Sequence, residues 1–179
     1  MGLYLNALSG TIPTELGLLT ELSVMALFYN KLSGSIPTEL GLLTELLELY
    51  LWDNNLTGSI PTELGRSTEL SILYLYENTL SGSIPTELGV LTELSLLYLY
   101  DNTLSGTIPT EMGLLTELSR FYLYYNTMTG SIPSSLCGFN VDIFIDCGEI
   151  ACTCCRCDAS DHNVGRRLYG FQKENMDTH

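Results

Sequence analysis

The sequence predicts a solenoid, in which each repeat forms one coil that stacks on the next. Three residue types recur at a step of 24 residues along the 179-residue chain. The prolines are Pro13, Pro37, Pro61, Pro85, Pro109 and Pro133, the glycines include Gly10, Gly34, Gly58, Gly82, Gly106 and Gly130, and the asparagines include Asn6, Asn30, Asn54, Asn78, Asn102 and Asn126. A fixed period in this range is typical of stacked repeats that contact only their neighbours.

The repeat opens with a short strand, and its clearest copy is Leu73–Thr92, which reads LYLYENTLSGSIPTELGVLT. Leu73 and Leu75 alternate with Tyr74 and Tyr76, a period of two that predicts leucines inside and tyrosines outside. One coil cannot bury these leucines alone. The inward positions must therefore be covered by the coils above and below.

After the strand, Asn78 is expected to turn inward, where its amide bonds to backbone groups of neighbouring coils. Gly82 and Gly89 are expected to allow tight bends, and Pro85 fixes its own backbone angle where no donor is needed. The remaining predicted core positions of this coil are Leu80, Ile84, Leu88 and Leu91.

One inward position breaks the pattern. Ser67, preceded by Arg66, occupies a column in which the other coils carry Leu19, Leu43, Leu91 and Leu115. We expect that coil to be underpacked. Ser67→Leu should therefore stabilise the protein by roughly 1–3 kcal/mol.

The consensus LxxLxLxxNxLxGxIPxxLGxL, which matches Met1 to Leu136, resembles the plant-type leucine-rich repeat of 24 residues. The resemblance implies an α/β-type solenoid, a curved right-handed superhelix with short parallel strands on the concave side and 3-10 or irregular turns on the convex side. Residues 1–136 are the repeats, of which the first is truncated. Met1–Asn6 aligns with the second half of a strand, so we interpret the chain as a fragment without an N-terminal cap.

The net charge of −14 is concentrated in two columns of glutamate. These are Glu15, Glu39, Glu63, Glu87 and Glu111, and Glu21, Glu45, Glu69, Glu93 and Glu117. They predict a solvated convex face, with a calcium-binding surface as the alternative. A basic stripe is absent, which argues against nucleic-acid binding.

The outward strand positions carry the predicted ligand site, a row of aromatic residues with carboxylates at its end. The predicted binding residues are Tyr50, Trp52, Asp53, Tyr74, Tyr76, Glu77, Tyr98, Tyr100, Asp101, Tyr122 and Tyr124. Exposed aromatic surface favours recognition of a protein, peptide or glycan. The alternative is that cross-strand aromatic pairs only stabilise the sheet.

Two other functions are weaker candidates. Asp53, Glu77 and Asp101 are carboxylates about 5 Å apart, near the separation in retaining glycosidases. Nothing in the sequence separates their pKa values, and the repeats contain no histidine, so we predict no enzyme and no cofactor. Rows of threonine from Thr14 to Thr110 and from Thr20 to Thr116 resemble ice-binding solenoids, although interleaved glutamates oppose a weakly hydrated plane.

A cysteine-rich C-terminal cap is predicted over residues 137–157. Its six cysteines, Cys137, Cys147, Cys152, Cys154, Cys155 and Cys157, favour three disulfides of open connectivity over a zinc or copper site. Ile145 and Cys147 are expected at the two inward strand positions, with Asp142, Phe144 and Asp146 outward.

The cysteines and the resemblance together imply a secreted or cell-surface protein, although the chain shows no signal peptide or membrane span. It resembles plant receptor ectodomains and secreted polygalacturonase-inhibitor-like proteins, and we expect a monomer or a fragment of a longer chain. Asn55-Leu56-Thr57 is a predicted glycosylation site. Residues 158–179 lose the period and are predicted to be a disordered tail.

Overall fold

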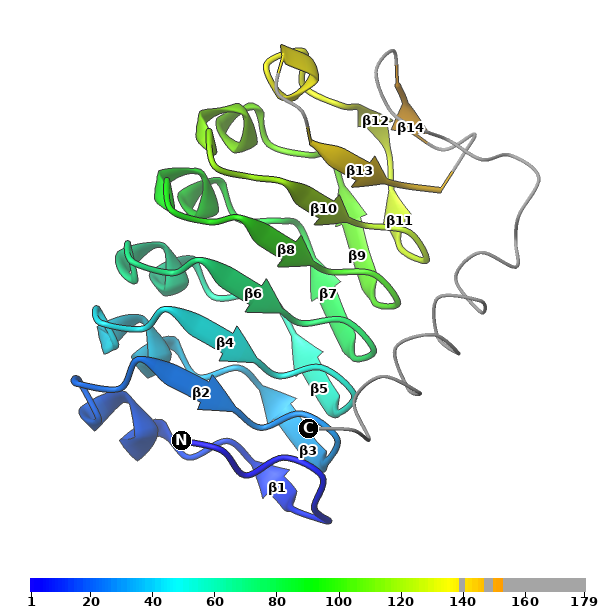
Figure 1. The fold of residues 1–179 in the computed structure, drawn as a ribbon. Helices are drawn as coiled ribbons and strands as arrows, with labels where there is room; N and C mark the ends of the chain where they lie inside the picture. The colour runs from blue at the N-terminus through cyan, green and yellow to red at the C-terminus, as the bar shows by residue number, and fades with distance from the viewer. Residues whose placement is uncertain (139–140, 147–149, 153–179) are drawn as a thin grey trace, which may run out of the picture.

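The computed structural model describes residues 1–138, 141–146 and 150–152. It is a solenoid in which the chain climbs coil by coil from the N-terminus (Figure 1). Each complete coil has three sides: a strand of a first sheet, a strand of a second sheet, and a short 3-10 helix. The predicted fold class is therefore confirmed.

The first sheet is parallel and has the strand order β13-β10-β8-β6-β4-β2. Its strands are β2 (Val24–Ala26), β4 (Glu48–Tyr50), β6 (Ile72–Tyr74), β8 (Leu96–Tyr98), β10 (Arg120–Tyr122) and β13 (Asp142–Phe144). Leu49 pairs with Leu73, and Leu73 pairs with Leu97. Equal positions of successive repeats thus lie in straight lines across the sheet.

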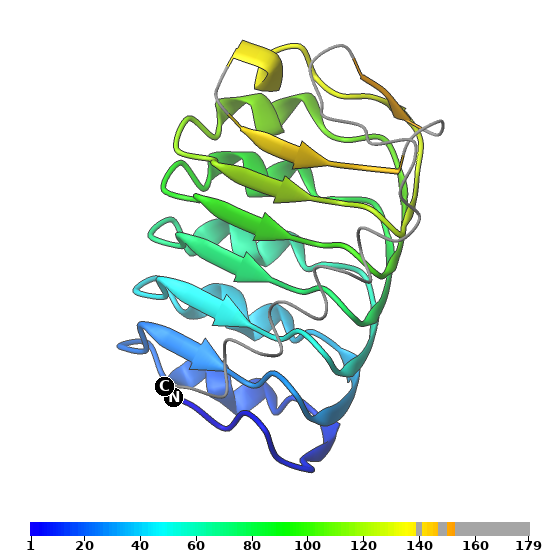
Figure 2. The same cartoon turned by 45° about the vertical axis from the view of Figure 1, so that its right-hand side comes forward.

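A second parallel sheet, which was not predicted from the sequence, runs along the neighbouring side (Figure 2). It contains β1 (Ser9–Thr11), β3 (Lys31–Ser35), β5 (Asn55–Gly58), β7 (Thr79–Gly82), β9 (Thr103–Gly106) and β11 (Thr127–Met128). Near the end of the stack, β12 (Gly130–Ser131) pairs with β14 (Ile150–Ala151). The signal for this sheet was present but short, since in most of its strands a buried leucine stands between two polar residues.

The third side consists of 3-10 helices. They are η1 (Thr14–Leu18), η2 (Thr38–Leu42), η3 (Thr62–Arg66), η4 (Thr86–Val90), η5 (Thr110–Leu114) and η6 (Leu136–Gly138). Each of η1 to η5 begins directly after a repeat proline, whose restricted φ suits the start of a helix. In η1 to η5 the central leucine or methionine is turned toward the core, and the threonine at the start of the helix is exposed.

The two glycines of the repeat have different roles. Gly82 has a φ of +78°, so it makes the predicted bend at the end of β7. For Gly89 the prediction of a bend is wrong. A Cβ at Gly89 would lie 2.6 Å from the carbonyl oxygen of Glu111, so the glycine instead allows the next coil to approach closely.

The asparagines form the predicted inward row. The side-chain amide of Asn78 donates hydrogen bonds to the carbonyl oxygens of Leu51, Leu75 and Tyr76 at 3.1–3.2 Å. Its Oδ1 accepts a bond of 3.0 Å from the backbone N–H of Leu56. The buried amide is therefore bonded both within its own coil and to the preceding one, which removes the cost of burying it.

The register of the cap differs from the prediction. Ile143 pairs with Phe121, and Ile143 and Ile145 are the two buried positions, so the expected pair of Ile145 and Cys147 is wrong. The reason is that 22 residues rather than 24 separate Phe121 from its partner. Asp142 is exposed and Phe144 and Asp146 are half-buried, which agrees with their expected outward direction.

Most of the cysteine prediction falls outside the described residues. Cys137 and Cys152 are each disulfide-bonded. Cys147, Cys154, Cys155 and Cys157 lie outside the described part, as does the predicted tail at 158–179, so the three-disulfide framework stays a prediction. In the described part, no helix is long and apolar enough to cross a bilayer.

Candidate functional site

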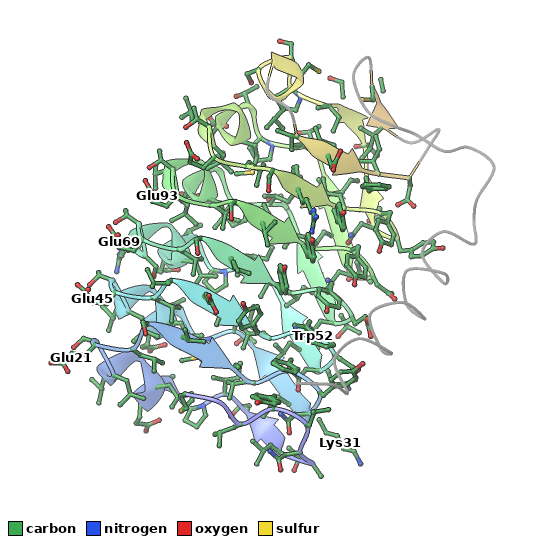
Figure 3. All side chains as sticks on the ribbon, viewed as in Figure 1. Glu21, Lys31, Glu45, Trp52, Glu69 and Glu93 are labelled. Atoms are coloured by element: carbon green, nitrogen blue, oxygen red, sulfur yellow. The ribbon has the colours of Figure 1, made fainter. Side chains whose placement is uncertain are left out.

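Four rows of outward side chains run along the first sheet, each with one residue from each coil. The mixed row is Val24, Glu48, Ile72, Leu96, Arg120 and Asp142; the first aromatic row is Ala26, Tyr50, Tyr74, Tyr98, Tyr122 and Phe144. The second aromatic row is Tyr4, Phe28, Trp52, Tyr76, Tyr100 and Tyr124, and the turn row is Leu5, Tyr29, Asp53, Glu77, Asp101 and Tyr125. Trp52 is labelled in Figure 3.

The second aromatic row is one continuous ring stack. Ring centroids of neighbours lie 4.4–4.9 Å apart, and the planes differ by at most 15°. Trp52, Tyr76 and Tyr100 are only 5–6% exposed, so the expectation of a broadly exposed aromatic surface is wrong for them. The strand spacing of about 4.8 Å is close to the stacking distance of aromatic rings, so each ring contacts its neighbours in the adjacent coils.

The first aromatic row stacks in a similar way but is more open. The rings of Tyr74 and Tyr98 lie 4.3 Å apart, and those of Tyr98 and Tyr122 lie 4.4 Å apart, both nearly parallel. Tyr98 is buried, whereas Tyr50, Tyr74 and Tyr122 are half-buried. The partly open tyrosines are thus held by their neighbours, which lowers the entropy lost when a ligand binds.

The phenol groups remain protonated well above neutral pH. Burial raises the pKa of Tyr122 to about 12, and it raises the pKa of Tyr50, Tyr74, Tyr76 and Tyr124 further. For Tyr50 a hydrogen bond adds to the effect, because its hydroxyl donates to Glu48 Oε2 at 2.9 Å. The aromatic rows therefore offer neutral hydrogen-bonding groups at physiological pH.

The predicted carboxylates lie in the turn row. Asp53, Glu77 and Asp101 have φ angles of +52° to +55°, the left-handed region that non-glycine residues rarely adopt. The turn follows the strand and lets the next asparagine point inward. Asp53 and Glu77 are half-buried and Asp101 is exposed, which agrees with the predicted position at the end of the strand.

The mixed row was not predicted from the sequence. Its members Glu48, Ile72, Leu96 and Arg120 each occupy the first position of their strand. The neighbouring aromatic rows barely change from coil to coil, while this row varies between acidic, apolar and basic side chains. That variation within near-identical repeats was the signal available in the sequence.

The second sheet has a face of hydroxyl groups. Two residues of each coil flank the repeat glycine, and every one is serine or threonine: Ser9 and Thr11, Ser33 and Ser35, Thr57 and Ser59, Ser81 and Ser83, Ser105 and Thr107, Thr129 and Ser131. All are exposed except the half-buried Ser33. We call this surface the hydroxyl face. Asn55, the predicted glycosylation site, is exposed at the start of β5 beside it.

The two threonine rows that suggested ice binding, from Thr14 to Thr110 and from Thr20 to Thr116, do not belong to the hydroxyl face. They lie in the 3-10 helices or directly after them. There the hydroxyl of Thr86 contacts Glu87 Oε2 at 3.1 Å, and the equivalent contact recurs in η1, η2, η3 and η5. Figure 3 shows Glu21, Glu45, Glu69 and Glu93 in one line at the edge of the molecule. In the described residues, no group of His, Cys, Asp and Glu could hold a metal ion.

Comparisons with known proteins agree with this geometry. The family model described as Leucine Rich Repeat matches residues 45–67 and 69–91. No curated protein matches the chain significantly.

Several solved structures resemble the chain. The LRR ectodomain of the receptor kinase GASSHO1/SCHENGEN3 from Arabidopsis thaliana, in complex with CASPARIAN STRIP INTEGRITY FACTOR 2, is 38% identical with a TM-score of 0.80 over 85% of this chain. The Arabidopsis HAESA ectodomain, in complex with an IDA peptide hormone, is 42% identical with a TM-score of 0.73 over 79%. A plant ice-binding protein is 32% identical with a TM-score of 0.72 over 82% of this chain and 47% of its own.

This chain spans 18% of the GASSHO1 structure and 24% of the HAESA structure. It spans more of the Arabidopsis BIR3–SERK2 complex structure, to which it is 39% identical with a TM-score of 0.63 over 73% of this chain and 69% of that one. The family match, the stacked parallel strands and these identities lead to one conclusion: the chain belongs to the plant-type leucine-rich repeat family.

Proposed function

We propose that the chain is a non-catalytic recognition module that binds a protein, peptide or glycan across the outer face of its first sheet. The observation that carries this proposal is the pair of stacked aromatic rows beside the chemically varied mixed row. Stiff aromatic groups with polar tips are the preferred anchors of binding surfaces. The related HAESA ectodomain was solved with a peptide hormone ligand, which supports the same use of this scaffold.

Rigidity is the physical advantage of the stack. Because each tyrosine ring is fixed by the rings of neighbouring coils, little side-chain freedom remains to be lost on binding. The half-buried Tyr50, Tyr74, Tyr122 and Tyr124 offer the partly open edges of this surface. The buried Trp52 has a supporting role instead, although it remains close enough to report on events at the face.

A binding screen tests the proposal. Trp52 is the one tryptophan of the chain, so its fluorescence reports titration with a library of peptides, proteins and oligosaccharides. Tyr122→Ala should weaken the strongest hit at least about fivefold, the effect of losing a typical anchor. Thr116→Ala, on the 3-10 side, is the matched control. The proposal fails if both variants retain every hit at wild-type affinity.

We also propose an extracellular location, supported by the relationship to plant receptor ectodomains. The expected disulfide framework of the cap fits that compartment. Thiol titration of the unreduced protein tests it, because a full set of three disulfides leaves no reactive thiol. Peptide mapping of Asn55 in secreted material would test the predicted glycan.

Adsorption to ice through the hydroxyl face is a second candidate function, in place of adsorption through the threonine rows. The specific observation is that this face is exposed, regular and free of charge along both hydroxyl lines, whereas carboxylates contact threonines on the 3-10 side. The similarity to a plant ice-binding protein also favours it.

An ice recrystallisation assay separates this candidate from peptide or glycan recognition. Ser83→Lys should abolish inhibition of ice recrystallisation, because a charged, hydrated group interrupts the face. Thr86→Lys, also exposed but on η4, should leave it unchanged. Wild-type protein without any effect on ice growth would rule out this function.

A further inference from the structure

The mixed row has an ordered charge pattern along the solenoid. Glu48, Ile72, Leu96 and Arg120 occupy the same register position in consecutive strands, so they lie in one line across the sheet. The line therefore presents a carboxylate, two apolar side chains and a guanidinium in that order. Ile72, Leu96 and Glu48 are half-buried, and Arg120 is exposed.

Both charged ends are supported by the neighbouring aromatic row. Glu48 accepts a hydrogen bond from the Tyr50 hydroxyl at 2.9 Å. The Nη1 of Arg120 donates to the Tyr98 hydroxyl oxygen at 3.5 Å. These contacts direct each charged group along the face while leaving further hydrogen-bonding capacity, because a carboxylate has about four acceptor sites and a guanidinium has five donors.

Arg120 is unusual in its surroundings. The other cationic side chains of the described residues are Lys31, in the second sheet, and Arg66, in η3, so neither belongs to the outward rows of the first sheet. Asp142 follows Arg120 in register. Arg120 is therefore the one cationic side chain among the described residues of the outward rows, and it can pair with a single anionic group of a ligand in competition with Asp142.

Resting on the proposed function, we propose that the mixed row binds an extended peptide with a cationic and an anionic side chain four residues apart and an apolar side chain midway between them. The cation faces Glu48, the anion faces Arg120, and the apolar side chain packs on Ile72 and Leu96. The peptide lies along the solenoid axis, across the strands.

The spacing follows from the two backbone geometries. Glu48 and Arg120 are separated by three coil steps, about 14 Å at a strand spacing of about 4.8 Å. An extended peptide rises about 3.3 Å per residue, so positions i and i+4 lie about 13 Å apart. Positions i, i+2 and i+4 also point to the same side of an extended chain. The matching pattern is therefore cation–x–apolar–x–anion.

The test uses the full chain and four synthetic peptides read out by Trp52 fluorescence. Wild type should bind a peptide containing Lys-Ser-Leu-Ser-Glu more tightly than its all-lysine, all-glutamate or Leu-to-Ser versions, by about two- to fivefold for each charge replaced. Arg120→Glu should reverse the order and prefer Lys-Ser-Leu-Ser-Lys. Arg66→Glu makes the same change of net charge on the 3-10 side and should keep the wild-type order.

Each outcome is decisive. A reversed preference in Arg120→Glu alone supports the charge pattern, because a purely structural role or a change of net charge would not switch the preferred peptide. Equal effects of the Arg120 and Arg66 variants would overturn it. If wild type binds none of these peptides but does bind a glycan or protein in the screen, the inference is overturned while the proposed function stands. If it binds nothing in either experiment, both are overturned.

Discussion

Ser67→Leu is the substitution whose effect follows most directly from the structure. Ser67 is fully buried, and its hydroxyl has no hydrogen-bond partner among the described residues. The equivalent Leu43, Leu91 and Leu115 are also fully buried and belong to the main core. The serine therefore combines two defects at one position: a missing apolar side chain and an unsatisfied polar group.

The two defects have separable magnitudes. Removing a buried, unpaired hydroxyl should stabilise the protein by about 1–3 kcal/mol. A leucine side chain in a core contributes about 2–5 kcal/mol to the free energy of unfolding relative to alanine. The gain at position 67 is smaller where the coil has already relaxed to fill the space beside the serine. We therefore expect about 1 kcal/mol from Ser67→Ala and about 2–3 kcal/mol from Ser67→Leu. The converse change, Leu91→Ser, should lower the free energy of unfolding by at least as much as Ser67→Leu raises it.

Thermal unfolding followed by circular dichroism measures this series. For a protein of this size, 1 kcal/mol shifts the Tm by about 2–4 °C, so Ser67→Leu should raise the Tm by about 4–12 °C. Equal Tm values for the alanine and leucine variants would mean that the coil has no room for the larger side chain. A Tm below that of wild type for Ser67→Leu would refute the packing argument, because it would show an overfilled core.

Three further predictions test other parts of the repeat. Asn78→Ala should destabilise the protein by about 3 kcal/mol, measured by urea unfolding. The buried N–H of Leu56 loses its acceptor, and three amide-to-carbonyl bonds that join two coils are lost, although the carbonyl oxygens themselves keep other donors. Gly89→Ala should lower the Tm because its Cβ would clash with the Glu111 carbonyl. Gly138→Ala should change the Tm little, because its Cβ would meet none of the described residues within 4 Å beyond its chain neighbours. Raising the pH above about 10 should progressively destabilise the fold. The pKa of Tyr122 and of the other buried phenols is raised in the folded protein, so the unfolded chain loses these protons first. Absorbance titration should show phenolate appearing together with unfolding, and ionisation of these tyrosines near pH 10 with the fold intact would contradict the prediction.

The fold was predictable because every coil carries the same residue types at the same positions. The leucines of the strand, the isoleucine before each proline and the inward asparagine recur from coil to coil, and a stacked arrangement buries all of them at once. Even the defect at Ser67 was visible, since the leucines of four other coils define what its column requires. The second sheet was missed because most of its strands carry a single buried leucine before the repeat glycine, so their alternation covers little more than one period.

The functional surface was less predictable, because exposure depends on neighbours in space. Trp52 and Tyr76 were correctly placed outside the leucine core, but their ring contacts across coils bury them, and no pattern within one repeat reveals that. The mixed row was overlooked because it does not repeat. Periodicity reveals what stays constant, while recognition depends on what differs from coil to coil.

The sequence by itself determined the period, the inward columns and the family, because hydrophobic burial in a stack requires the same residue types at the same step. Only the tertiary structure decided which of the outward side chains stay accessible and how the cap joins the stack. The parallel register brings Glu48 and Arg120 onto one line three strands apart, moves the cap by two residues, and gathers the serines and threonines beside each glycine into one face. Those relations arise from the stacking distance between strands, which no single repeat contains.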